Sequence, residues 1–232
     1  MGEYKNILFP TSLLAYLFLG ISSFSYGFFE KMRFRVSKYL DAGSNTVLSA
    51  FGSFIALFIS VIFLKEGLTI FKILGAFLVL IAIVLISEFK SSNVSKKGIF
   101  LGLISFTFLG IGWGVDKIGT AYFKPEVYNI FIWTIPVIII YLPHTKYSEI
   151  KYEISNNKFS LSVMAFLNVI GYILQLKALS LTEAFKVIPV VQTSIILTVL
   201  AGVIFMNENH NIYRKIIAAL LSFIGVLFLV NN

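Results

Sequence analysis

Eight stretches of the chain are apolar and contain no Asp, Glu, Lys or Arg. Most have the roughly 17–25 residues that an α-helix needs to cross about 30 Å of hydrocarbon. Backbone amides find no water inside a bilayer, so a segment that crosses it must be helical. The pattern predicts an all-α, polytopic integral membrane protein with eight transmembrane helices, at residues 7–29, 43–64, 73–87, 98–115, 127–145, 159–176, 187–207 and 216–232.

The second half of the sequence contains a diverged copy of the first half. Residues 181–230 align without a gap on residues 39–88 when the numbering is shifted by 142, and Glu208 then falls on Glu66. Each copy has an apolar span, an acidic turn and a second apolar span. We therefore predict two related repeats, residues 1–88 with three helices and residues 98–232 with five, joined by a linker at 89–97.

The repeat also indicates that two helices are missing. The same shift moves residues 98–142, which hold the first two spans of the second repeat, to positions before residue 1. We expect about 45 further residues upstream in the natural gene, forming two more spans. The first span has some features of a signal peptide, but it aligns with a retained helix of the second repeat, which argues against cleavage.

Two connectors between the spans are long and polar, at residues 88–97 and 144–158. Two spans separate them, so both should face the same side of the membrane. The remaining turns are short, which predicts antiparallel packing of neighbouring helices.

Composition supports lipid as the solvent. The chain is 58% hydrophobic and 13% charged, too little polar surface for a water-soluble globule. Its net charge of +8 comes from Lys and Arg between the spans, where such residues set membrane orientation, so we predict no nucleic-acid partner. The sequence has no Cys, which excludes disulfides and thiolate metal sites.

Polar side chains inside the spans fall at helical spacing and are the candidates for solute binding. Asn168, Tyr172 and Gln175 are one example, at positions i, i+4 and i+7. Polar groups in lipid are costly and normally face protein or water. Any one of them is explained by a hydrogen bond to a neighbouring helix, but several stripes together favour a shared central cavity. The predicted substrate-binding residues are Tyr26, Asn45, Ser49, Asn168, Tyr172, Gln175, Gln192 and Thr193.

Other residues that could carry chemistry form no recognisable catalytic signature. The glycines of FLGIGWGVDK lack the spacing of a nucleotide-binding loop. His144 and His210 lie in different connectors, without the spacing of paired metal ligands. No nucleophile lies in a recognisable Ser, His and Asp signature. We predict that the protein is not an enzyme, with no metal and no cofactor.

Three acids remain outside these patterns. Glu66 and Glu208 follow long apolar runs, and a position near the positive end of the next helix dipole explains them better than a proton or ion site. Asp116, followed by Lys117, comes at the end of a span and is expected to mark the membrane interface.

Several short motifs occur in a family-like order. Residues 178–191 read ALSLTEAFKVIPVV, FLKEG and FMNEN are acidic turns, and IGWG lies at 111–114. In this the chain resembles the EamA type of the drug/metabolite transporter superfamily, over nearly its whole length. Residues 178–191 are similar to the signature A-L-x-x-x-x-A-x-x-x-x-P-L of that family. The chain departs from the pattern at Val47, which aligns with Pro189, and in lacking the first two of ten helices.

The resemblance implies two inverted repeats and secondary active transport of a small organic solute by alternating access. The partners are then membrane lipid and a small-molecule solute, with self-association left open, and the expected location is the cell membrane, as a multi-pass protein. Two other interpretations stay open at this point: an integral membrane enzyme acting on lipid, and a non-transporting fragment or assembly subunit. The sequence specifies neither the solute nor the coupling ion.

Overall fold

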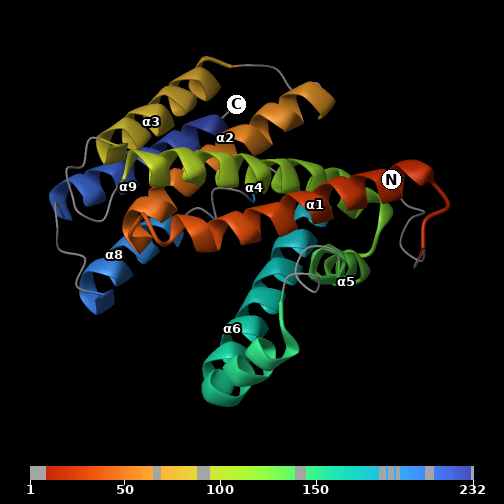
Figure 1. The fold of residues 1–232 in the computed structure, drawn as a ribbon. Helices are drawn as coiled ribbons and strands as arrows, with labels where there is room; N and C mark the ends of the chain where they lie inside the picture. Colours follow the sequence, from red (N-terminus) through yellow and green to blue (C-terminus); the bar gives the residue numbers. More distant parts are fainter. Residues whose placement is uncertain are drawn as a thin grey trace. The chain divides into compact units, whose positions relative to one another are not determined.

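The computed structural model describes residues 9–64, 69–87, 95–138, 145–182, 187, 191, 194–206 and 212–230. These residues form eight α-helices (Figure 1). The helices are α1 (Leu13–Val36), α2 (Ala42–Leu64), α3 (Ile70–Ser87), α4 (Lys96–Tyr122), α5 (Pro125–Pro136), α6 (Tyr147–Leu181), α8 (Ser194–Met206) and α9 (Ile212–Val230). The predicted all-α class is confirmed.

Three of the described helices are long and apolar enough to cross a membrane: α1, α4 and α6. α4 has 27 residues, which at 1.5 Å per residue is about 40 Å of helix. Two shorter apolar stretches, Ile73–Ala82 and Ser194–Met206, lie in α3 and α8. The chain is therefore a helical membrane protein that crosses the bilayer more than once.

α1 continues beyond the span predicted for it. It runs to Val36 and carries Arg33 and Arg35 in its last turn, where the negative end of the helix dipole favours cations. Arg33 lies 2.6 Å from the carboxylate of Glu30, one turn earlier. The ion pair lets the helix continue past the end of its apolar run.

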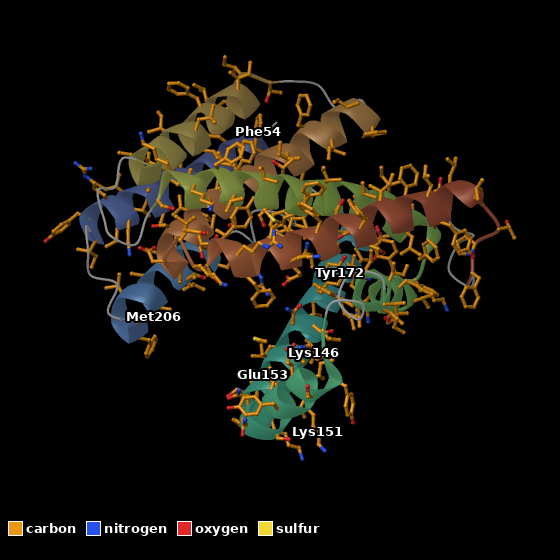
Figure 2. All side chains as sticks on the ribbon, in the orientation of Figure 1. Phe54, Lys146, Lys151, Glu153, Tyr172 and Met206 are labelled. Carbon is orange, nitrogen blue, oxygen red and sulfur yellow. The ribbon has the colours of Figure 1, made fainter. Side chains whose placement is uncertain are left out.

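The second of the two polar connectors is helical rather than irregular. α6 has 35 residues and includes most of that connector, with a kink at Asn157 (φ −122°, ψ 25°). The Asn157 side chain donates to Glu153 at 2.9 Å, a pairing at i, i+4 that supports a solvated helix. Figure 2 shows Lys151 and Glu153 at the end of α6 away from Tyr172. Hydropathy located the polar segment but could not reveal its helical conformation.

The chain divides into two compact units. Unit 1 is Met1–Gly27 with Val115–Thr182, and unit 2 is Phe28–Gly114 with Glu183–Asn232. α1 and α4 each contribute one part to either unit. Unit 1 otherwise contains α5 and α6, and unit 2 contains α2, α3, α8 and α9. The predicted division into repeats at residues 88 and 98 concerns internal similarity and stays a prediction.

Unit 2 is packed through close backbone contacts. α3 and α9 make the most extensive helix pair, and Figure 1 shows them side by side. A Cβ added at Gly225 of α9 would lie 2.9 Å from the carbonyl oxygen of Gly75 in α3. A Cβ added at Gly110 of α4 would overlap the carbonyl oxygen of Gly52 in α2. Glycine at these crossings lets the backbones approach closely, as is common between helices in membranes.

A buried ion pair adds a polar contact to unit 2. Lys215 of α9 lies 3.0 Å from Asp41, and their side chains are only 3% and 12% exposed. The other carboxylate oxygen of Asp41 accepts the backbone N–H of Ser44 at 2.7 Å, which caps the first turn of α2. Asp41 therefore caps the start of α2 and forms an ion pair with α9.

Candidate functional site

The most polar buried point of unit 1 is a single carboxylate. Asp116, in the last turns of α4, is 0% exposed. Its Oδ1 accepts hydrogen bonds from Ser22 at 2.7 Å and Tyr128 at 3.2 Å. Its Oδ2 accepts from Tyr26 at 2.6 Å and Tyr172 at 2.8 Å. We call these five residues the Asp116 cage.

Four different helices build the cage. Ser22 and Tyr26 are one turn apart on α1, so both hydroxyls reach the same carboxylate. Tyr128 comes from the first turn of α5, whose Pro125 suits a helix start. Tyr172 comes from the apolar half of α6. The cage joins helices that apolar packing alone would hold loosely in lipid.

A glycine makes room for one of the tyrosines. A Cβ added at Gly119, one turn after Asp116, would lie 2.5 Å from the hydroxyl oxygen of Tyr128. Any side chain at this position would push Tyr128 away from the carboxylate. The absence of a side chain at Gly119 therefore belongs to the architecture of the cage.

The hydrogen-bond count indicates the chemistry of the cage. An ionised carboxylate has about four acceptor positions and no donor, and the four hydroxyls supply one donor to each. All four partners among the described residues are uncharged. A carboxylate held only by neutral groups in an apolar helix is expensive, and such residues typically serve ion or substrate pathways. The arrangement can bind a proton at Asp116 if one of the hydroxyls turns away.

Three aromatic rings cover one side of the cage. The Tyr26 and Tyr172 rings meet edge-on with centroids 5.5 Å apart. The Trp133 ring of α5 lies 5.9 Å from that of Tyr26 and 5.7 Å from that of Tyr172. Such ring pairs add attraction beyond the area they bury. They fix the two tyrosine hydroxyls that point at Oδ2.

The ammonium group of Lys117, the residue after Asp116, donates hydrogen bonds to backbone carbonyl groups of another helix. Its Nζ donates to the backbone carbonyl oxygens of Leu179 at 2.6 Å and Thr182 at 2.7 Å. These carbonyls end α6, where a cation is favoured by the helix dipole. Asp116 and Lys117 therefore attach the end of α4 to two different parts of α6. Asp116 is fully buried, and the expectation that these two residues mark the membrane interface stays a prediction.

An ion pair lies on the surface of unit 1, at the first turn of α5. The Lys177 ammonium lies 2.8 Å from Glu126, and both side chains are about half exposed. The hydrogen bond from Lys177 holds the pKa of the Glu126 carboxyl below the ordinary value of 4.5. This exposed carboxylate and the buried one show two different environments for an acid within one unit.

The predicted solute-binding residues fall into different places. Tyr26 and Tyr172, predicted from separate stripes, come together in the cage. Gln175 is half-buried on α6, and Asn168 is exposed. A common cavity for the whole set stays a prediction.

The remaining members of the predicted set belong to α2 or lie outside the described residues. Asn45 and Ser49 belong to α2 of unit 2. Ser49 donates to the Thr46 carbonyl oxygen at 2.6 Å, within its own helix. Gln192 and Thr193 lie outside the described residues, as do the acids Glu66 and Glu208.

Sequence reasoning missed Ser22, Asp116, Tyr128 and Trp133 as site residues. Asp116 ends an apolar run, and that position resembles an interface when only the local segment is considered. A usable signal was present, because an acid one helical turn before Gly119 and beside aromatic-rich spans is unusual in lipid. Tyr128 and Trp133 gave no comparable signal.

The class defined so far is a polytopic α-helical membrane protein with a polar site inside it. The sequence model of the EamA-like transporter family matches residues 2–88 and 96–231. The chain belongs to the EamA-like transporter family, a family of transporters and not of enzymes. No curated protein and no solved structure matches the chain significantly.

Proposed function

We propose that this protein is a secondary active transporter that moves a small organic solute across the cell membrane by alternating access. Membership of the EamA-like family supports solute transport in general. In this proposal the eight helices all span the membrane and form two inverted repeats, of three and five helices. The observation that carries the proposal is the buried Asp116 cage, in which Tyr26 and Tyr172 were already candidates for solute binding.

We further propose that Asp116 couples transport by taking up and releasing a proton. When ionised, it accepts four hydroxyl hydrogens; when protonated, it becomes a donor and can no longer accept all four. At least one hydroxyl must then turn away, and Tyr128, at 3.2 Å, has the longest of the four bonds. Each bound or released proton would thus change the contacts of α4 with α1, α5 or α6.

The groups that face Asp116 do not compete for that proton. Among the described residues they are the hydroxyls of Ser22 and Tyr26 from α1, Tyr128 from α5 and Tyr172 from α6. Tyrosine ordinarily titrates near pH 10, far above the range in which a carboxyl does. The Lys117 ammonium is directed to the carbonyls that end α6.

The test uses the purified full chain in liposomes with an acidic exterior and a neutral interior. The vesicles are offered a mixture of neutral, cationic and anionic cytosolic metabolites, and their contents are quantified by mass spectrometry. The wild type should concentrate at least one metabolite above its outside level. Asp116→Asn, which resembles the protonated carboxyl, should let that metabolite equilibrate without concentrating it.

A matched control changes a different buried polar side chain on the same helix. Ser105 of α4 donates to the Phe29 carbonyl oxygen at 3.3 Å in unit 2. Ser105→Ala should concentrate the metabolite as the wild type does. Folded protein that admits no metabolite would contradict the transport proposal, and a concentrating Asp116→Asn protein would contradict the role of Asp116.

A further inference from the structure

Among the described residues of unit 1, three buried side-chain atoms have no hydrogen-bond partner: Ser23 Oγ on α1, and two that lie on one face of α5. Asn129 is 5% exposed, and its Oδ1 finds no hydrogen-bond partner within the described part of the chain. The same holds for the indole Nε1 of Trp133. Asn129 and Trp133 are separated by one helical turn, so their side chains are neighbours on the helix surface. We call them the α5 polar pair.

The pair differs from the polar groups around it. Asp116 has all four acceptor positions filled by hydroxyls. Burial of a polar atom without a hydrogen bond is costly, and most buried polar atoms in folded proteins have a partner. An unpaired acceptor and an unpaired donor on adjacent turns of one helix can therefore together bind a group that both donates and accepts a hydrogen bond.

The position of Trp133 connects the pair to the cage. Its ring contacts those of Tyr26 and Tyr172, with centroids 5.9 and 5.7 Å apart. Tyr128, which bonds Asp116, directly precedes Asn129 on α5. A solute group held by Asn129 and Trp133 would therefore lie beside the residues that hold Asp116.

We propose that Asn129 and Trp133 bind a carboxamide or lactam group of the transported solute, an inference that rests on the proposed transport function. The amide N–H of the solute donates to Asn129 Oδ1, and its carbonyl oxygen accepts from Trp133 Nε1. A carboxylate offers only acceptors and would leave Asn129 unpaired. An ammonium offers only donors and would leave Trp133 unpaired. A neutral amide supplies both groups on adjacent atoms and adds no second charge beside Asp116.

The sequence provides a direct optical test, because the chain has only two tryptophans, Trp113 and Trp133. In the full-length Trp113→Phe protein, purified in detergent, Trp133 is the sole tryptophan emitter. Its fluorescence is titrated with 2-pyrrolidinone, a lactam with both N–H and C=O. The comparison ligands are cyclopentanone and N-methyl-2-pyrrolidinone, which keep the carbonyl and lack the N–H.

2-Pyrrolidinone should change the Trp133 emission saturably and bind about two- to tenfold more tightly than either comparison ligand, the effect of one hydrogen bond. Equal affinities for the three ligands, or no saturable change, would overturn the proposal. This comparison requires no substitution in the pair itself. It also requires no transport, so failure of the amide site and failure of the transport function are separate results.

A variant of Asn129 completes the test. Asn129→Leu, made in the Trp113→Phe protein, should reduce the preference for 2-pyrrolidinone over cyclopentanone to about onefold. Leu removes an unpaired polar atom, so the variant should fold. Asn157→Leu, which changes an exposed amide on α6, should keep the preference. If Asn129→Leu only raises thermal stability and the preference persists, the pair is a structural water site and the proposal is wrong.

Discussion

Unit 1 and unit 2 are both made of apolar helices, yet they use different forces to hold them together. Unit 1 gathers four hydroxyls around Asp116. Unit 2 brings glycine backbones into contact, at Gly52 with Gly110 and at Gly75 with Gly225. Lipid tails are as apolar as leucine, so the hydrophobic effect gives little help to helices already in the membrane. Hydrogen bonds and close packing are the two interactions left to hold the helices together. Unit 1 relies mainly on hydrogen bonds and unit 2 mainly on close packing.

The difference bears on function. A glycine crossing has one tight arrangement, whereas a hydrogen-bonded carboxylate changes its partners when its charge changes. In the proposed transport function, unit 1 is therefore the part expected to respond to a proton or a solute. The ion pair between Asp41 and Lys215 is the exception in unit 2, because it is charged on both sides and needs no further cation.

The largest effect is expected from breaking that ion pair. Lys215→Met leaves Asp41 charged and buried without its cation, and loss of one partner of a buried pair typically costs about 3–5 kcal/mol. The free energy of unfolding, measured by titrating the detergent-solubilised protein with dodecyl sulfate, should fall accordingly. Lys151→Met, at an exposed position, should change it by no more than about 0.5 kcal/mol.

A second substitution in the same pair separates charge from packing. Asn can still cap α2 at position 41, so Asp41→Asn combined with Lys215→Met should recover part of the lost stability. If the double variant is as unstable as Lys215→Met alone, the loss comes from the packing of the lysine side chain rather than from the unpaired carboxylate.

An intermediate effect is expected in unit 1. Tyr172→Phe keeps the ring against Tyr26 and Trp133 but removes the 2.8 Å hydrogen bond to Asp116. Hydrogen bonds to charged groups contribute about 1.5–3 kcal/mol, so the same titration should show a loss of that size. Tyr128→Phe, which removes a bond of 3.2 Å, should cost less. A larger loss for Tyr128→Phe would mean that the cage is not held chiefly through Oδ2.

The smallest net effect is expected from the glycines. In Gly110→Ala the new methyl group meets the Gly52 carbonyl oxygen and Ile55, and overpacking of this kind costs about 1–3 kcal/mol. Alanine recovers about 0.5–1 kcal/mol through its better helix propensity, so the net loss should be about 0–2.5 kcal/mol. The control is Gly20→Ala, where nothing lies within 4 Å of the added Cβ and a small gain is expected. Equal effects at both positions would refute close packing at Gly110.

Some of the site could be predicted from the sequence because it depends on local spacing. Tyr26 and Tyr172 stood out as polar groups at helical intervals in apolar spans, and both are in the cage. Asp116 did not, because its neighbours along the chain place it at the end of an apolar run. Its burial depends on Ser22, 94 residues earlier, and on Tyr172, 56 residues later. No window of local sequence contains those partners.

The sequence by itself determined the solvent and the secondary structure, since a chain of apolar runs must lie in lipid and must satisfy its backbone as helices. The tertiary structure alone decided which polar groups meet. It placed four hydroxyls on Asp116, left Asn129 and Trp133 without partners among the described residues, and directed Lys117 to the end of α6. The physical reason is that hydropathy belongs to a segment, whereas the free energy of a buried polar atom depends on partners supplied by other helices.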